Sequence, residues 1–320
     1  MRAPEVFLSS EGFAVPYEEL WAFLNASREV LHHLSLHHLG RTYLLMVQTF
    51  TLGGETYERR ALLCMVDKRE YRIYPHENTF PEGVRFYMEL AREFPYQFAP
   101  VMLVGEDEYG VLKSARTDEL LYEGVFYGVR TRLYTAEVEG ELPREMVIAD
   151  GHHRFAGYGE EIFVAFLDLN DPALKILPTH RGLRMEMAEM KARLRSASAL
   201  ARVLRGFTGE YLRRFPIVLK ARNSRAIGLT FHPPEGPLGN VPTYLSDEVL
   251  LAGRSEYIVG YERYAREALR KLSGGDYDFV LFVRPTTPQQ VMEVARAGLK
   301  MPRKSTDFFP KLVAGPMFVR

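Results

Sequence analysis

The sequence predicts an α+β fold with mixed or antiparallel sheets and flanking helices. Apolar, β-branched segments are interspersed with amphipathic segments, but without the regular strand–helix–strand rhythm of a doubly wound sheet. Two pairs of strand-like segments flank short turn sequences, Gly53-Gly54 and Asn223-Ser224, which is typical of β-hairpins. With 320 residues, 47% of them hydrophobic, the chain can form one elaborate domain or two closely packed ones.

The first half of the chain is predicted to be rich in strands. A hairpin around Gly53-Gly54 covers residues 42–66, and residues 71–74 can extend its sheet. A helix is expected over residues 82–94, because Pro81 precedes an amphipathic run. Further apolar runs predict strands at 100–104, 125–138, 146–149 and 162–167.

The second half is predicted to begin with a helix over residues 185–206, followed by the second hairpin at 217–231. Thr287, Pro288 and Gln290 form a capping-box sequence that starts another helix. The remaining predictions are a helix over 247–252 capped by Ser246, a helix over 262–272 and a strand over 278–283. We expect an N-terminal region, 1–184, and a C-terminal region, 185–320, which can also form one compact unit.

Composition excludes several classes of protein. Lys+Arg and Asp+Glu both total 41, and zero net charge disfavours wrapping of long nucleic acid. No stretch approaches 18 uncharged apolar residues, so no membrane-spanning helix is expected. The only cysteine, Cys64, excludes a disulfide framework and a cysteine-based zinc site. The N-terminal residues lack the apolar core of a secretion signal, so we expect a cytoplasmic protein.

Four histidines, His32, His33, His37 and His38, lie in one short segment. On a helix, His33 and His37 would share a face and could bind one metal ion. No carboxylate lies between them in the zinc-protease pattern, and leucines alternate with the histidines. This pattern favours the flank of an apolar helix face over a metal site.

The most informative motif follows the apolar run at 146–149. The run leads directly into Asp150-Gly151-His152-His153-Arg154, and a helical turn can continue from there. A junction from strand to helix concentrates free backbone N–H groups, and Gly151 lets a ligand approach the backbone. With the His and Arg donors, this predicts a phosphate-sized anion site. The alternative is an Asp-capped helix whose His and Arg side chains pair with neighbouring carboxylates.

Three other polar clusters also follow apolar runs. In the first, Glu77 lies beside His76 and could be a general base or a magnesium ligand, or this segment is an ordinary turn. In the second, His180 and Arg181 repeat the pattern of a His and an Arg beside a strand. In the third, Lys304, Ser305 and Thr306 form a set of anion donors without the glycines of a P-loop, or a solvated loop.

In their order along the chain, these clusters resemble the family known as domain of unknown function 1015. The matching stretches are QTFTLGGETYERRALL (48–63), YPHENTF (74–80), VIADGHHRF (147–155), ILPTHR (176–181) and MPRKSTDFFPKLVAG (301–315). Two departures from the family pattern stand out. Val15-Pro16-Tyr17 is a shortened remnant of a Pro-Pro-Tyr-Asp stretch, with Glu18 in place of Asp, and Gly157 and Gly159 shorten the helix after Arg154.

The Asp-Gly-His-His-Arg run is also similar to the Gly-x-x-Arg and Gly-x-His-Arg signatures of the ParB/sulfiredoxin superfamily. That superfamily includes CTP-hydrolysing partition proteins, ATP-dependent sulfiredoxins and free-serine kinases, in which such a junction holds nucleotide phosphates. The resemblance implies a ParB/sulfiredoxin-like core around residues 70–185. It also suggests a DNA-binding role, which the zero net charge and the lack of a helix-turn-helix pattern disfavour.

Together the motifs and the resemblance imply nucleotide-dependent phosphotransfer to a small hydroxylated metabolite, such as free serine, with ATP or ADP and Mg²⁺ as cofactors. The catalytic candidates are Glu77 as base or metal ligand, Asp150 as helix cap or metal ligand, and His76. The phosphate-binding candidates are Gly151, His152, His153, Arg154, His180, Arg181, Lys304, Ser305 and Thr306.

Two alternatives use the same residues. One is a non-catalytic sensor that binds a nucleotide or another anion without turnover. The other is a hydrolase with a metal ion bound by His76, Glu77, Asp150, His152 and His180.

Overall fold

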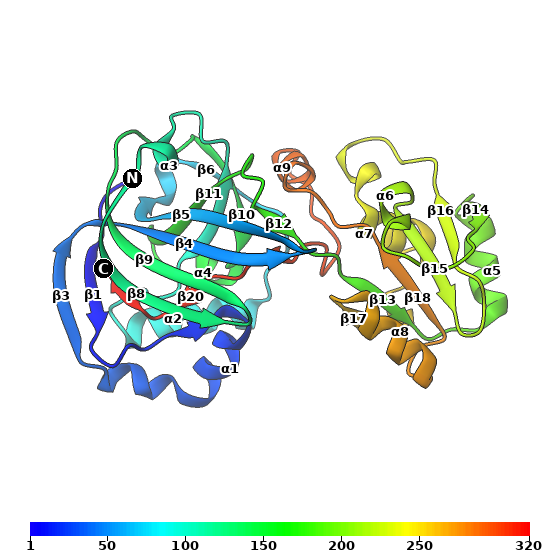
Figure 1. The fold of residues 1–320 in the computed structure, drawn as a ribbon, viewed down its shortest axis with the longest axis horizontal. Helices are drawn as coiled ribbons and strands as arrows, with labels where there is room; N and C mark the ends of the chain where they lie inside the picture. The colour runs from blue at the N-terminus through cyan, green and yellow to red at the C-terminus, as the bar shows by residue number, and fades with distance from the viewer. The chain divides into compact units, whose positions relative to one another are not determined.

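The computed structural model describes residues 1–320. The chain forms two compact units, Met1–Lys175 together with Phe308–Arg320, and Ile176–Asp307 (Figure 1). Two short strands, β12 (Lys175–Ile176) and β19 (Phe308–Phe309), lie where the chain passes from one unit to the other. This division differs from the predicted one at residue 184 in the placement of residues 176–184 and 308–320.

The first unit is built on an eight-stranded sheet with the order β6-β10-β7-β11-β5-β4-β9-β8. The pairs β10–β6 and β11–β7 are parallel and the other pairs are antiparallel, so the sheet is mixed. Its strands are β4 (Tyr43–Leu52), β5 (Glu55–Asp67), β6 (Arg72–Pro75), β7 (Val101–Gly105), β8 (Arg116–Phe126), β9 (Val129–Glu137), β10 (Glu145–Asp150) and β11 (Glu161–Asp168).

Helices and two small sheets complete the first unit. The C-terminal strand β21 pairs with β1, which pairs in turn with β3, and β20 pairs with β2. The main core includes Phe98, Phe166 and Phe318, each at most 1% exposed. The elements are β1 (Glu5–Ser9), β2 (Val15–Pro16), α1 (Tyr17–Ser27), η1 (Arg28–His33), β3 (Leu36–Arg41), η2 (Lys68–Glu70), α2 (Pro81–Glu93), α3 (Val111–Ser114), α4 (His152–Gly157), β20 (Val313–Ala314) and β21 (Met317–Val319).

The second unit contains an antiparallel six-stranded sheet with the order β14-β16-β15-β18-β13-β17. Its strands are β13 (His180–Leu183), β14 (Leu200–Val203), β15 (Ile217–Ala221), β16 (Ile227–Thr230), β17 (Ile258–Glu262) and β18 (Phe279–Val283). Its helical segments are α5 (Met187–Ser196), α6 (Tyr211–Arg214), η3 (Pro237–Asn240), α7 (Pro242–Tyr244), the π-helical η4 (Leu245–Leu250), η5 (Ser255–Tyr257), α8 (Ala265–Gly274) and α9 (Pro288–Arg296).

The mixed and antiparallel sheets with surrounding helices confirm the predicted α+β class. Both predicted hairpins are present, as β4–β5 and β15–β16. The capping box of α9 forms with both of its hydrogen bonds, 3.2 Å from the Gln290 amide to Thr287 Oγ1 and 3.0 Å from the Thr287 amide to Gln290 Oε1. The ParB/sulfiredoxin-like core stays a prediction.

The predicted long strand over 125–138 is wrong. The chain reverses at Tyr127 and Gly128, whose φ angles are 51° and 78°, and this turn joins β8 to β9. A two-residue hairpin needs positive φ at both turn positions, which glycine adopts readily and tyrosine rarely does. The tyrosine continues the apolar alternation in the sequence, and it therefore conceals the turn.

Three predictions in the second unit also need correction. The helix predicted over 185–206 ends at Ser196, and Ser198, with φ 48°, leads into strand β14, which pairs with β16. Ser246 is not an N-cap, because it is buried inside η4 and donates a hydrogen bond of 2.9 Å to the Thr243 carbonyl. The helix predicted over 262–272 begins only at Ala265, because residues 258–262 form β17.

The histidine-rich segment is not one helix. His32 and His33 end the 3₁₀ helix η1, whereas His37 and His38 are neighbours on strand β3 and point to opposite faces of it. His33 and His37 therefore do not share a helix face. No group of three or more His, Cys, Asp or Glu side chains anywhere in residues 1–320 is placed to hold a metal ion. No helix is both long and apolar enough to cross a membrane.

Candidate functional site

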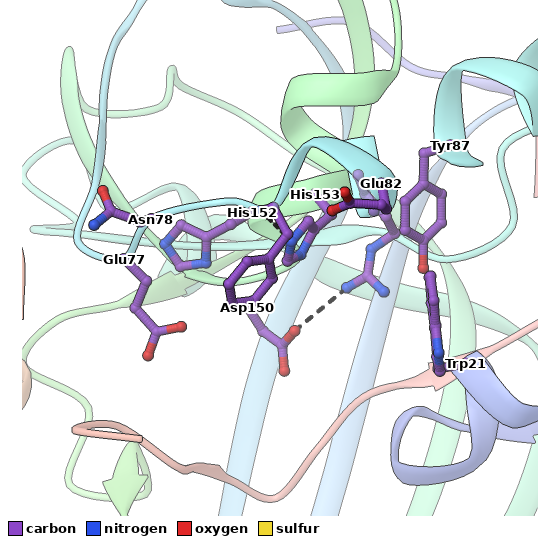
Figure 2. Close-up of a pocket in the computed structure, with 12 residues that line it drawn as sticks. Trp21, Glu77, Asn78, Glu82, Tyr87, Asp150, His152 and His153 are labelled. Atoms are coloured by element: carbon purple, nitrogen blue, oxygen red, sulfur yellow. Dashed lines mark hydrogen bonds and ion pairs between the residues drawn. The ribbon is translucent and has the colours of Figure 1, made fainter. Parts of the chain in front are cut away.

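A pocket of about 570 Å³ in the first unit brings together the segments after β6 and β10 (Figure 2). Helices α1 and α2 contribute aromatic and acidic side chains to its wall. The lining residues are Trp21, Glu77, Asn78, Phe80, Glu82, Gly83, Tyr87, Asp150, Gly151, His152, His153 and Arg154. Two clusters that are more than 70 residues apart in the sequence thus contribute to one site.

The sheet explains why these two clusters meet. Strands β6 and β10 are parallel neighbours, with Pro75 opposite Ile148, so their carboxyl ends lie at the same edge. Side chains that follow such strand ends converge in a crevice outside the sheet. A hydrogen bond of 2.7 Å between His76 Nδ1 and the Ile148 carbonyl fastens the two strand ends together.

The backbone at Gly151 has a conformation that favours glycine. Its φ is 95°, and a Cβ atom there would lie 2.7 Å from Arg154 Nη2. Helix α4 starts directly after Gly151 and has only six residues. It ends at Gly157, where a Cβ atom would lie 2.7 Å from Tyr87 Cβ, so the glycine permits close packing of α4 against α2. The predicted shortening of the helix after Arg154 is therefore confirmed. Because α4 is so short, we attribute the positive charge of the site to side chains and not to the helix dipole.

Arg154 provides a buried positive charge in the pocket wall. Only 5% of the residue is exposed, and its Nε and Nη2 atoms have no hydrogen-bond partner. Nη2 lies 3.6 Å from Asp150 Oδ1, which is an ion-pair distance but too long for a hydrogen bond. The guanidinium carbon lies 4.4 Å from the centre of the Tyr17 ring, in cation–π geometry. Buried polar groups are normally hydrogen-bonded, so the open donors favour binding of an anion here.

Asp150 lies between two cations. Its Oδ2 atom accepts a hydrogen bond of 2.8 Å from Lys311 Nζ, and its Oδ1 atom faces Arg154. Burial alone would raise the pKa of Asp150, but the charges of Lys311 and Arg154 outweigh burial and lower it. Asp150 is therefore ionised at neutral pH. The dashed line in Figure 2 marks its ion pair with Arg154.

Glu77 and His152 line another part of the pocket, and His76 is buried beside them without lining it. His76 is fully buried, and its Nε2 atom lies 3.8 Å from Glu77 Oε1. Its ring is close to perpendicular to that of His152, with the ring centres 4.7 Å apart. Because a carbonyl oxygen only accepts, the bond to Ile148 places a proton on His76 Nδ1. Figure 2 shows the carboxylates of Glu77 and Asp150 extending to the same side of the pocket.

His153 contacts the residue that precedes α2, at the wall of the pocket. Its Nε2 atom accepts a hydrogen bond of 3.0 Å from the Phe80 amide, and its ring stacks on the Phe80 ring with centres 5.7 Å apart. Burial, assisted by the charge of Arg154, lowers the pKa of His153, so the ring is neutral at pH 7. Gly83 permits this arrangement, because a Cβ atom there would lie 2.4 Å from the imidazole.

Several residues at this site were missed from the sequence. Trp21 and Phe80 line the pocket with 51% and 47% of their surfaces exposed, which leaves aromatic surface available for a planar ligand group. Tyr17 lies near the start of the chain and Lys311 near its end. Their contacts with Arg154 and Asp150 join positions more than 130 residues apart, so no local pattern indicates them.

The predicted residues His180 and Arg181 lie on β13 in the second unit. Arg181 is fully buried, and its guanidinium donates to both Asp247 oxygens at 3.0 and 2.9 Å and to the carbonyls of Thr179, Arg303 and Lys304. These contacts use all five donors of an arginine. We therefore assign to Arg181 the role of holding the 303–304 loop, and not that of contacting phosphate.

The other predicted residues of the second unit are His180, next to Arg181 on β13, and Lys304, Ser305 and Thr306, in or directly after the 303–304 loop. His180 Nδ1 accepts a hydrogen bond of 3.2 Å from the Val283 amide, and burial lowers its pKa to about 4. The Ser305 hydroxyl is buried and bonds to the Pro302 carbonyl and to Thr243 Oγ1 at 2.6 and 2.7 Å. Lys304 is exposed and Thr306 is partly exposed. A contact of Lys304, Ser305 or Thr306 with a ligand stays a prediction.

The comparisons with known proteins now complete this description. The chain belongs to the family described as "Protein of unknown function (DUF1015)", whose model matches residues 39–233. This confirms the resemblance to that family, whereas the similarity to the ParB/sulfiredoxin superfamily stays a prediction. No curated protein is significantly similar to the chain.

The solved structures that match the chain include a conserved hypothetical protein from Pyrococcus furiosus, with a TM-score of 0.45, 15% identity and coverage of 79% of this chain and 95% of that chain. A free serine kinase in complex with AMP has a TM-score of 0.47, 15% identity and coverage of 79% and 92%. SbnI with a C-terminal truncation, from Staphylococcus aureus, has a TM-score of 0.47, 11% identity and coverage of 79% and 85%.

Proposed function

We propose that this protein binds a nucleotide in the pocket of the first unit and transfers a phosphoryl group to a small hydroxylated metabolite, with free serine as one candidate. The observation that carries the proposal is the buried Arg154 guanidinium with open donors beside two carboxylates, Glu77 and Asp150. Phosphoryl transfer depends mainly on positioning and on neutralising charge, and this set of side chains can do both.

In this proposal the phosphates lie against Arg154. Its planar guanidinium can bind phosphate oxygens in a bidentate way. Gly151 leaves room for this guanidinium, because a Cβ atom there would lie 2.7 Å from Arg154 Nη2. The exposed faces of Trp21 and Phe80 can pack against the nucleobase.

Glu77 is the proposed general base. It lies in the pocket wall with 34% of its side chain exposed, which makes it accessible to an acceptor hydroxyl. The buried His76 beside it is held by the Ile148 carbonyl, so it can fix the orientation of the carboxylate. Asp150 is less suitable as a base, because Lys311 and Arg154 stabilise its charge.

Mg²⁺ fits this site only as part of a complex with the nucleotide. Both oxygens of Asp150 already face cations, which leaves Glu77 and Glu82 as the other carboxylates of the pocket. Magnesium is commonly held by one or two carboxylates together with phosphate oxygens. When bound, it would neutralise charge on the phosphates. We do not propose the metal-dependent hydrolase, because no group of three or more ligating side chains is formed.

The test is a turnover assay with ADP or ATP, Mg²⁺ and a pool of hydroxylated metabolites that includes L-serine, followed by ³¹P NMR and mass spectrometry. We expect consumption of the nucleotide and one phosphorylated acceptor. Glu77→Gln should lower turnover by about a hundredfold and leave nucleotide binding intact. The matched control is Glu82→Gln, which removes another carboxylate of the same pocket.

Two outcomes would count against the proposal. If neither ADP nor ATP binds, it is wrong. If a nucleotide binds but is not consumed with any acceptor, the pocket is a non-catalytic nucleotide or anion site.

A further inference from the structure

The two cations beside Asp150 are not equivalent. Lys311 Nζ makes a hydrogen bond of 2.8 Å to Oδ2, whereas Arg154 Nη2 stays 3.6 Å from Oδ1 and makes no hydrogen bond. Lys311 therefore takes the close position on the carboxylate. Arg154, which lines the pocket, is left with Nε and Nη2 buried and without a hydrogen-bond partner.

Lys311 is held in place by a row of buried polar side chains in the eight-stranded sheet. Arg59 on β5, Gln48 on β4 and Thr131 on β9 are direct cross-strand partners, and each is only 1% exposed. Arg59 donates to Gln48 Oε1 and, at 2.6 Å, to the Pro310 carbonyl. Gln48 Nε2 donates to the Lys311 carbonyl at 2.9 Å and to Thr131 Oγ1 at 3.2 Å. The carbonyls of Pro310 and Lys311, which are consecutive in the C-terminal segment, are thus hydrogen-bonded to side chains of the sheet.

We propose that Lys311 binds the Asp150 carboxylate and thereby prevents Asp150 from taking up the Arg154 donors that an anionic ligand needs. Arg59 and Gln48 hold the backbone of residues 310–311 so that Lys311 can reach Asp150. The inference rests on the anion site of the proposed function. It assigns positioning roles to three residues that do not line the pocket.

The charges show why Lys311 matters. Within the group of Arg154, Asp150 and Lys311, two positive charges face the one carboxylate, while Glu77 and Glu82 line other parts of the pocket. Without Lys311 the charge of Asp150 would act on Arg154 alone, across a gap of 3.6 Å. The short i,i+4 separation of the two residues would let this pair close into a hydrogen-bonded ion pair, which would take up the donors that the ligand needs.

The burial of Arg59 supports a positioning role. A buried guanidinium is costly, and Nε and Nη1 of Arg59 have no hydrogen-bond partner. Burial lowers the pKa of Arg59 to about 9. The charge of Asp171 offsets part of this effect. The hydrogen bonds of Arg59 to the Pro310 carbonyl and to Gln48 tie the C-terminal segment to the sheet.

The experiment measures binding of ADP with Mg²⁺, and separately of inorganic pyrophosphate, to the full chain. Trp21 is the only tryptophan and lines the pocket, so its fluorescence can follow both titrations. Lys311→Gln should weaken binding of both probes by about tenfold or more. The double variant Asp150→Asn/Lys311→Gln should recover the affinity to within about threefold of wild type, because the competing carboxylate charge is gone.

Variants of the buried row test the positioning. Arg59→Met and Gln48→Met should each weaken binding in the same direction as Lys311→Gln, and Asp150→Asn should again restore it. Thr131→Val is the matched control, because Thr131 contacts Gln48 but neither anchored carbonyl. If Arg59→Met does not fold, Gln48→Met and Lys311→Gln still decide the matter.

The outcomes separate this inference from the proposed function. If wild type binds ADP but Lys311→Gln binds it equally well, or if Asp150→Asn fails to rescue Lys311→Gln, the inference is wrong and the nucleotide site stands. If pyrophosphate binds with the expected pattern but no nucleotide binds, the inference stands and the proposed function fails. If wild type binds neither probe, both are wrong.

Discussion

The two units each contain a His-Arg pair with the same sequence but with different surroundings. The imidazoles behave alike: His153 accepts a hydrogen bond from the Phe80 amide, and His180 accepts one from the Val283 amide. The arginines differ. Arg181 has a bidentate bond to Asp247 and three carbonyl acceptors, whereas Arg154 has two nitrogen atoms without a hydrogen-bond partner and lines a pocket.

This comparison shows that residue type beside a strand does not by itself distinguish a binding arginine from a structural one. The distinction depends on how many donors the surrounding chain satisfies. Asp247, the partner that satisfies Arg181, is 66 residues away in the sequence, so only the folded structure reveals it. The contrast between the His153-Arg154 and His180-Arg181 pairs leads to four expected outcomes, from the largest effect to the smallest.

Loss of Arg181 should destabilise the second unit. Arg181→Met leaves the largely buried Asp247 carboxylate without its cation and three carbonyls without their Arg181 donor. We expect a loss of about 3–5 kcal/mol in the free energy of unfolding. Denaturant titration followed by circular dichroism measures this. The matched control is Arg193→Met, which removes an i,i+4 pair with Glu189 and should cost less than about 1 kcal/mol. Equal effects of the two variants would refute the structural role of Arg181.

Loss of Arg154 should instead affect binding. Arg154→Met should weaken ADP affinity by about a hundredfold, because a desolvated arginine–phosphate contact is lost. The loss of stability should be smaller than for Arg181→Met, since Nε and Nη2 have no hydrogen bonds and only the ion pair with Asp150 and the contact with Tyr17 are lost. Calorimetric titration and thermal melting of the same sample give both quantities. A large drop in melting temperature with unchanged affinity would reverse the assignment.

His180 should make the second unit sensitive to acid. Burial lowers the pKa of His180 to about 4, below the ordinary value of 6.5, so the unfolded chain takes up a proton in this range that the native chain does not. The free energy of unfolding therefore falls as the pH drops through this window, by about 2 kcal/mol between pH 7.5 and pH 5.

The variant His180→Asn can still accept the Val283 amide but does not titrate, so it should lose this contribution to the pH dependence. Hydrogen exchange of the β18 amides at both pH values measures the effect in the second unit alone. An identical pH dependence in wild type and variant would show that His180 is not responsible.

Two glycines next to these pairs should respond differently to alanine. At Gly151 the new Cβ would lie 2.7 Å from Arg154 Nη2, so Gly151→Ala should weaken ADP binding, with a backbone cost of about 1–2 kcal/mol at positive φ. At Gly182 it would lie 2.4 Å from the Tyr277 ring, so Gly182→Ala should cost about 1–3 kcal/mol in stability and leave binding unchanged. Binding titration and denaturant unfolding of both variants test this, and equal loss of binding in both would contradict it.

Much of the fold could be predicted from local patterns. Both hairpins, the capping box at Thr287 and the strand before Asp150 depend on neighbouring residues, and all four are confirmed. The wrong predictions lie where one local sequence pattern is compatible with two secondary structures. The turn at Tyr127-Gly128 lies inside an alternating run, and the strand after Ser196 exists because β16 is available as a partner.

The candidate site was only partly predictable for the same reason. Glu77 and the 150–154 junction follow strand ends, which sequence reveals, and parallel pairing of the two strands brings them to one pocket. The 301–315 stretch contains two lysines, and the hydroxyls beside Lys304 made it the favoured anion donor. Lys311 reaches Asp150 only because Gln48 and Arg59 anchor its backbone.

The most direct test of the central claim is a crystal structure of the full chain with ADP bound. We predict a phosphate oxygen within hydrogen-bond distance of Arg154 Nε or Nη2, with Lys311 still bound to Asp150. A nucleotide bound elsewhere, with no phosphate oxygen in contact with Arg154, would contradict the account.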